Sequence, residues 1–260
     1  MKPAAEPADT IYFTLQELGA IIALSVLAAL SGALVPSWLF PEGRISAFVY
    51  NTLALPGPGA GVLVFGSILC FWLLLGLIVV KKPGTAVAMA TVLIAIDLLV
   101  GSQVILIQTI DVLLIVALII EVVCLLPAGR IPEKNLLPAG LAGLSLVTVA
   151  IALLGKAAQG ESDIPLTGIP WFYFVCGILG LCFAFISYRH PSKFLLAAGL
   201  ANSYYLVHFW LFWGEGFASR FPPVLEMIPV LLLVALLGGV LSGSAAYGIE
   251  LLAKRFGHDQ

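Results

Sequence analysis

Long uninterrupted stretches of apolar residues dominate this chain, and eight of them are long enough to cross a bilayer. The clearest runs from Val62 to Val80 and stops at Lys81-Lys82-Pro83-Gly84. At about 1.5 Å per residue, such a stretch spans a hydrocarbon core of about 30 Å. The pattern therefore predicts an all-α, polytopic membrane bundle of about eight transmembrane helices, at residues 18–35, 62–80, 85–105, 109–126, 136–154, 170–188, 194–213 and 227–253.

Turn and cap signals mark some of the ends of these helices. Thr14 is followed three residues later by Glu17, the pattern of a capping box at the start of a helix. The third and fourth stretches are separated by almost no linker, so we expect a tight hairpin near Gln108. The whole chain, residues 1–260, reads as a single membrane domain without a second, soluble one.

The basic residues set the orientation, because cytoplasmic loops are enriched in Lys and Arg. An N-terminus in the cytoplasm puts nine of the twelve basic residues on that side and three outside, so both termini are predicted to be cytoplasmic. Residues 1–13 then form a cytoplasmic tail, and residues 36–61 and 155–168 form outer loops. The nine are Lys2, Lys81, Lys82, Arg130, Lys134, Arg189, Lys193, Lys254 and Arg255, and the three are Arg44, Lys156 and Arg220.

Composition supports a multi-pass protein of the cell membrane and excludes several other classes. Hydrophobic residues make up 61% of the chain and charged residues only 10%, far below the usual quarter of a soluble domain. A net charge of −2 argues against a nucleic-acid partner. The four cysteines lie in apolar runs without C-x-x-C spacing, and catalytic motifs are missing, so neither a metal nor a cofactor is expected.

Ionisable residues inside membrane spans are costly and are therefore candidates for a functional site. Asp97, Gln108 and Asp111 gather toward the outer side of the predicted hairpin, which suits a polar ligand arriving from outside. Asp111 has an alternative role as an interfacial residue near a helix N-terminus, where negative charge is favoured. Glu121 lies deeper in an apolar run and joins the predicted substrate-binding set, whereas an isolated histidine such as His208 is more often a packed residue than a ligand.

The first outer loop has the length and composition of a lid. Its 26 residues are rich in Pro and Gly, which is more than a simple connection needs. We predict that Trp38 and Asn51 contact the substrate from this loop. The alternative for Trp38 is a place in the aromatic belt at the membrane interface.

Small residues at four-residue spacing allow close packing of membrane helices. Ser25, Ala29 and Ala33 form such a strip on the first span, and Gly239 and Gly243 form one on the last. These strips either pack within the protein or dock a partner membrane protein, and the spacing alone leaves both possibilities open.

The first half of the chain resembles the substrate-binding S components of energy-coupling factor (ECF) type ABC transporters. The resembling segments are FTLQELGAIIALSVLAALSGAL, LPGPGAGVLVFG and VVKKPG, within residues 14–126. The resemblance implies a non-enzymatic membrane component that binds a vitamin, a vitamin precursor or a metal ion for uptake. It also implies a transmembrane coupling subunit and two ATPase subunits as partners, with Ser25, Ala29 and Ala33 at the docking surface. That family commonly has six spans, fewer than the eight predicted here.

A second resemblance competes in the other half. Asn202-Ser203-Tyr204-Tyr205-Leu206-Val207-His208 and Ala245–Lys254 look like the last two spans of integral-membrane acyltransferases, which would make His208 a candidate base. The Arg and His expected in the first span of that class are missing here. A structural or assembly subunit without a ligand is a further alternative. The carboxylates allow a cationic vitamin precursor or a metal, and the sequence does not choose between these ligands.

Overall fold

The protein is helical throughout the residues that the structure describes. The computed structural model describes residues 12–39, 53, 55, 59, 61–100, 107–125, 133–158, 169–189, 192–220 and 228–257, among which there is no strand. The helices are α1 (Leu15–Leu39), the π-helix η2 (Gly61–Phe65), α3 (Gly66–Val80), α4 (Thr85–Val100), α5 (Ile107–Leu125), α6 (Glu133–Ala158), α7 (Ile169–Arg189), α8 (Lys193–Arg220) and α9 (Ile228–Gly257).

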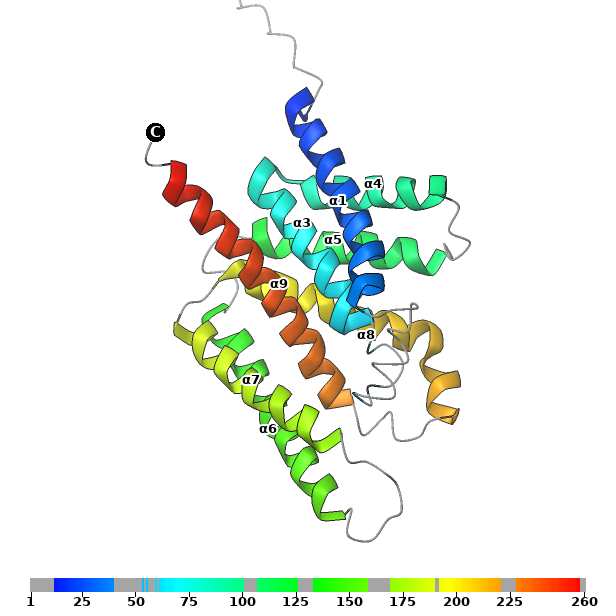
Figure 1. The fold of residues 1–260 in the computed structure, drawn as a ribbon, viewed down its shortest axis with the longest axis vertical. Coiled ribbons are helices and arrows are strands. Elements are labelled where there is room, and N and C mark those ends of the chain that lie inside the picture. Colours follow the sequence, from blue (N-terminus) through cyan, green and yellow to red (C-terminus); the bar gives the residue numbers. More distant parts are fainter. Residues whose placement is uncertain are drawn as a thin grey trace, which may run out of the picture.

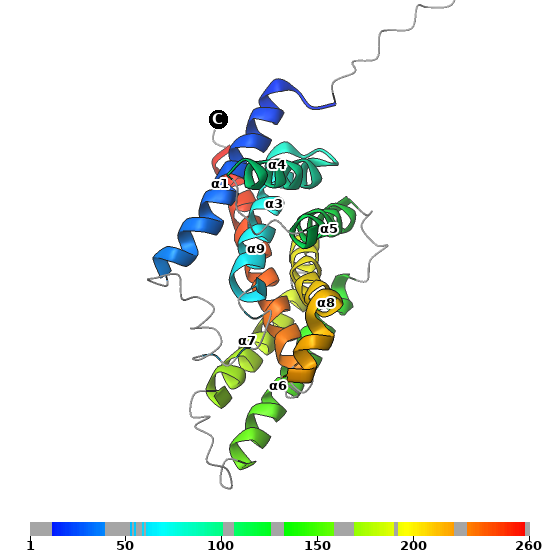
Figure 2. The same ribbon diagram turned by 90° about the vertical axis from the view of Figure 1, so that its right-hand side faces the viewer.

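Six of these helices are long and apolar enough to cross a membrane, so the prediction of a multi-pass helical membrane protein is confirmed at that level. All eight predicted stretches form helices, but the count of eight membrane spans is not confirmed. The exceptions are α4 and α5, which lie across the direction shared by α1, α3, α6, α7 and α9 (Figures 1 and 2). With 16 residues, α4 is also shorter than a usual span.

Glycines bring α8 and α9 into close contact at the centre of the bundle. A side chain at Gly239 would collide with the backbone of Ala198, and one at Gly243 would lie 2.7 Å from the carbonyl oxygen of Phe194. The spacing of four residues puts both glycines on one face of α9. The Gly239–Gly243 strip therefore packs within the protein, which decides between the two alternatives that the sequence left open for it.

A buried asparagine joins three helices in the same region. The Asn202 side-chain amide donates hydrogen bonds to the carbonyl oxygens of Val62 in η2, at 2.8 Å, and Ala235 in α9, at 2.7 Å. Asn202 has no exposed surface, and Gly66 and Gly238 leave no room beside it for a further side chain. This junction fixes α3, α8 and α9 relative to one another.

Polar contacts tie the start of α1 to the end of α3. The predicted capping box is confirmed, since the Thr14 amide donates to Glu17 at 2.7 Å and the Glu17 amide donates to Thr14 at 3.3 Å. Glu17 also forms an ion pair with Lys82 at 2.7 Å. Just before it, Lys81 adopts a left-handed conformation with φ of 57° and ends α3, as its position at the end of the apolar run predicts.

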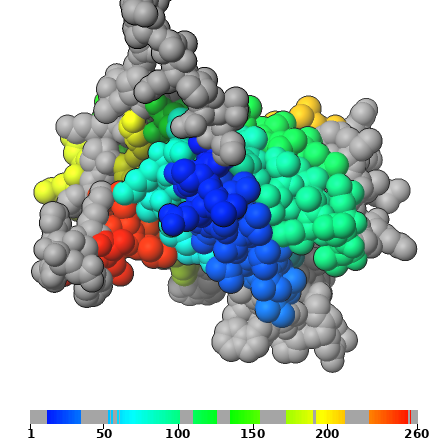
Figure 3. Space-filling model, turned by 90° about the horizontal axis from the view of Figure 1, so that it is seen from above, coloured from blue at the N-terminus to red at the C-terminus, as the bar shows by residue number. Residues whose placement is uncertain are grey.

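Helix α1 lies at the edge of the bundle, over α3 and α4 (Figure 3). Its buried side is narrow, and the hydroxyl of Ser25 donates to the carbonyl oxygen of Met89 in α4 at 3.3 Å. The indole of Trp72 in α3 donates to the hydroxyl of Ser31 at 2.6 Å. The opposite side of α1 exposes large apolar residues such as Ile22 and Leu30, as expected for a helix that faces lipid.

Candidate functional site

Helices α5 and α8 bring an acidic, a phenolic and an imidazole side chain together. Tyr204 and His208 are four residues apart and therefore share one face of α8. Oδ2 of Asp111 lies 3.2 Å from Nδ1 of His208 and accepts a hydrogen bond from the Tyr204 hydroxyl at 3.4 Å. We call Asp111, Tyr204 and His208 the α5–α8 cluster.

The second carboxylate oxygen of Asp111 is buried without a hydrogen-bond partner in the described part of the chain. Such an atom loses the hydrogen bonds that water would supply, and a ligand can restore them. The amide oxygen of Asn202 is also buried and unpaired, but it packs against Gly66, where nothing else fits. In contrast, the Asp111 side chain as a whole is 30% exposed, although Oδ1 itself is covered.

Two kinds of chemistry are open to this arrangement. A carboxylate accepts hydrogen bonds and attracts cations, so Asp111 can hold a ligand that carries N–H or O–H donors. A carboxylate on Nδ1 of histidine also fixes the orientation of the ring, so Nε2 is the nitrogen through which the pair would transfer a proton. The side chain of His208 is 12% exposed and lies at the edge of the cluster.

Glu121 lies elsewhere and its carboxylate is already engaged. It accepts hydrogen bonds from the backbone amides of Gly84, at 3.0 Å, and Ala86, at 2.5 Å, at the N-terminus of α4. The positive end of the helix dipole and two donors offset the cost of burying this charge. The structure thus gives Glu121 a capping role, and its predicted contact with substrate stays a prediction.

The other predicted contacts are only partly visible. Asp97 lies near the end of α4 and is half-buried, and among the described residues no hydrogen bond joins it to Asp111. Asn51 and the side chains of Trp38 and Gln108 lie outside the described part of the chain. Of the predicted substrate-binding residues, the structure therefore brings Asp111 together with His208 and leaves the lid prediction as it was.

Tyr204 was missed by the sequence analysis, although a signal was available. It lies one helical turn before His208, in the segment Asn202–His208 that resembles the acyltransferase spans. Two polar side chains four residues apart on an apolar helix share a face and indicate a polar partner on the neighbouring helix. The spacing could therefore have indicated that Tyr204 acts with His208.

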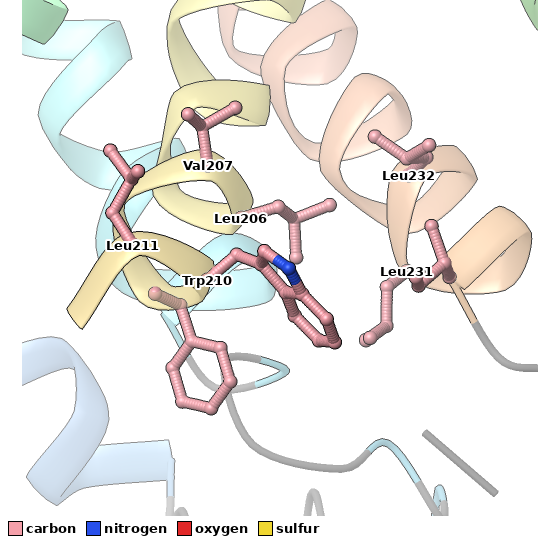
Figure 4. Close-up of a pocket in the computed structure, with 8 residues that line it drawn as sticks. Leu206, Val207, Trp210, Leu211, Leu231 and Leu232 are labelled. Carbon is pink, nitrogen blue, oxygen red and sulfur yellow. The ribbon is translucent and has the colours of Figure 1, made fainter. Parts of the chain in front are cut away.

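An apolar pocket of about 290 Å³ lies between α8 and α9 (Figure 4). Neither Asp111 nor Tyr204 nor His208 is among the residues that line it. The pocket is therefore separate from the α5–α8 cluster. Its lining residues are Leu206, Val207, Phe209, Trp210, Leu211, Ile228, Leu231 and Leu232.

The predicted docking strip on α1 turns only partly outward. Ser25 is fully buried against α4, Ala29 is half-buried and Ala33 is exposed. Open space surrounds Gly19 and Gly32, since an added side-chain carbon at either would meet nothing within 4 Å. The surface of α1 that could receive a partner helix therefore includes Gly19 and Ala33, which share a face, whereas Ser25 faces inward.

No protein-family model matches this chain, and comparisons with curated proteins and with solved structures also give no match. The function is therefore argued from the membrane fold and the α5–α8 cluster. Within the described residues no group of three or more His, Cys, Asp or Glu side chains comes together as a metal site.

Proposed function

We propose that this protein is the substrate-binding membrane component of an ATP-driven uptake system for a small polar nutrient, and that the nutrient binds at the α5–α8 cluster. The observation that carries the proposal is the buried Oδ1 of Asp111, which has no partner in the described part of the chain while its side chain is accessible. An ionisable group at membrane depth with an unfilled hydrogen bond is the feature expected of a ligand site.

The position of the cluster along α8 suits a ligand that arrives from outside. His208 lies about four helical turns beyond Lys193, and five residues before the predicted end of this span at Trp213. The distribution of basic residues puts Lys193 on the cytoplasmic side. The cluster would then lie in the outer half of the membrane.

The span count also supports a component of this type. The two helices that are not among the six candidate spans, α4 and α5, can be removed from the count of spans without changing the side of any basic residue, because they come as a pair. Six spans then remain, with the same nine-to-three division of charge. Six is the number that is common in the S components that the first half of the chain resembles.

A coupling subunit would bind on the outward side of α1. Among the six candidate spans, α1 has the smallest buried share, and open space surrounds Gly19 and Gly32. Small residues on such a face let the backbone of a partner helix approach closely. The docking surface predicted from the sequence would therefore shift from Ser25 toward Ala33 and Gly19, which share one face.

Affinity purification from the native membrane in mild detergent, followed by mass spectrometry, tests the proposal. We expect a membrane coupling subunit and two ATPase subunits to co-purify, and Gly19→Leu to release them by filling the space on the outward face of α1. Gly140→Leu is the matched control, since Gly140 in α6 also has open space around it. A protein that purifies alone from its native membrane would contradict the uptake role.

Acyl transfer is a second candidate function, and the contact between Asp111 and Nδ1 of His208 favours it. In that reaction the hydroxyl group of the acyl-accepting molecule would give its proton to Nε2 while the hydroxyl oxygen attacks the acyl carbonyl carbon. The same proton would then pass to the leaving group as its bond to the acyl carbon breaks. An acyltransferase should lose at least about 100-fold in rate with His208→Gln, whereas ligand binding should change far less because Gln keeps a hydrogen-bonding side chain.

A further inference from the structure

We propose that the ligand of the α5–α8 cluster is a small organic cation that presents an ammonium group to Oδ1 of Asp111. This inference rests on the proposed function and adds the chemical class of the substrate. It chooses between the two ligand classes, an organic cation and a metal ion, that the sequence leaves open.

Charge is the first reason. The described basic side chains occur where helices begin or end on the predicted cytoplasmic side: Lys82 follows α3, Arg189 ends α7, Lys193 begins α8 and Arg255 lies near the end of α9. Asp111 lies several turns away, in the neighbourhood of His208. In the described part of the chain, Asp111 thus has no Lys or Arg beside it, and an anionic ligand would meet the carboxylate without a permanently charged cation nearby.

The second reason is that the cluster uses only one of the two carboxylate oxygens. The Tyr204 hydroxyl and Nδ1 of His208 both approach Oδ2, which leaves Oδ1 to a ligand. Either protonation state of the imidazole can donate from Nδ1. An ammonium group supplies N–H donors together with the missing positive charge.

The third reason separates an ammonium group from a metal ion. Asp111 and His208 are two potential metal ligands, and the described residues supply no third His, Cys, Asp or Glu at this place. Calcium ions take six to eight oxygen ligands, and zinc sites take three or more protein ligands. The ring of Tyr204, whose centroid lies 6.3 Å from that of His208, instead offers an aromatic surface beside which an organic cation is stabilised.

The test uses the full-length protein in lipid nanodiscs, with butylammonium, 1-butanol and butyrate as probes of matched size. Binding is measured by isothermal titration and by the shift in thermal unfolding at constant ionic strength. We expect saturable binding of butylammonium alone, weakened at least about 30-fold by Asp111→Asn, since truncating one member of a close charge pair has an effect of this size. Glu250→Gln is the control, because it removes a carboxylate from the last third of α9, outside the cluster, and should leave binding unchanged.

A second readout is mass spectrometry of small molecules that co-purify with the wild-type protein but not with Asp111→Asn. A co-purifying amine supports the inference. A neutral or anionic molecule that depends on Asp111 would overturn the cation while leaving the uptake role in place. If no molecule co-purifies in an Asp111-dependent way and no probe binds, both the cation and the binding role of the α5–α8 cluster are overturned. If Asp111→Asn does not fold, the affinity of the wild-type protein for butylammonium is compared with its affinity for butyrate, and equal or stronger binding of butyrate would overturn the inference. Asp111→Glu should still bind the cation more tightly than the anion.

Discussion

The two ends of the apolar part of α8 are built on different principles. Toward its start, Ala198 and Asn202 press against glycines of α9 and α3, and no further atom fits between the helices. Toward its other end, Tyr204 and His208 meet Asp111 across a looser contact that leaves one buried oxygen unpaired. One helix therefore contributes both to the rigid centre of the bundle and to the place where a ligand can bind.

An unpaired buried oxygen indicates a site only where the side chain that carries it is partly exposed. The amide oxygen of Asn202 and Oδ1 of Asp111 both lack partners in the described part of the chain, but only the Asp111 side chain is partly exposed. A rigid junction near a looser cluster is the arrangement expected of a binding protein, because a fixed scaffold holds the binding groups in place. The predictions below test whether the junction is as rigid as its contacts indicate.

Gly239→Ala should have the largest effect. The new methyl group would collide with the backbone of Ala198, which cannot move aside as a flexible side chain would. We expect a loss of about 3 kcal/mol or more in stability, measured as the midpoint of thermal unfolding in detergent. Gly248→Ala on the same helix has open space and serves as the matched control. Equal behaviour of the two variants would show that the α8–α9 contact is not tight.

Asn202→Ala should come next. It removes two hydrogen bonds that join α8 to η2 and α9, at 2.8 and 2.7 Å. The expected cost is about 2 kcal/mol, again from thermal unfolding. Ser203→Ala removes only a hydrogen bond within α8, to the carbonyl oxygen of Gly199, and should cost much less. A cost that is no larger for Asn202→Ala would argue against the three-helix junction.

Glu121→Gln should have a smaller and local effect, of about 1–2 kcal/mol. Gln keeps one acceptor oxygen but loses the charge that faces the N-terminus of α4. The amides of Gly84 and Ala86 should exchange with deuterium about ten times faster or more, as measured by hydrogen exchange. Exchange that does not change, or that changes as much in Glu250→Gln, would remove the capping role.

Lys82→Met should have the smallest effect, at most about 1 kcal/mol. Its ion pair with Glu17 is partly exposed, with side chains 33% and 23% accessible, so water and salt screen it. The neighbouring Lys81→Met, which removes the same charge without this ion pair, is the control. The difference in unfolding midpoint should shrink as salt is added, and a difference that salt does not reduce would contradict an ion-pair origin.

Local patterns account for the part of the fold that could be predicted. The run from Val62 to Val80 forms a helix that ends where Lys81 and Lys82 begin, and Thr14 and Glu17 form the expected capping box. Each of these features depends on residues that are close in sequence. The strip of Gly239 and Gly243 was recognised too, but its partner was not, because a spacing of four defines a face without naming the helix that packs on it.

The sequence could identify Asp111 and Glu121 as carboxylates in apolar surroundings, but not their different roles. Both lie on α5, and their partners are decided by how that helix is placed. Glu121 contacts the first turn of α4. Asp111 contacts Tyr204 and His208 of α8, which lie 93 and 97 positions further along the chain. No periodicity within α5 contains that information.

By itself, the sequence determined a helical membrane protein. A run of about twenty apolar residues in lipid can form all its backbone hydrogen bonds within the run only as a helix. It also determined where most helices begin and end, through turns, caps and basic residues. The tertiary structure alone decided that α4 and α5 lie across the bundle, and that Asp111 pairs with Tyr204 and His208 (Figure 1). The physical reason is that lipid stabilises any apolar helix to a similar extent. Only close packing between particular side chains sets which helices contact each other and how they are rotated.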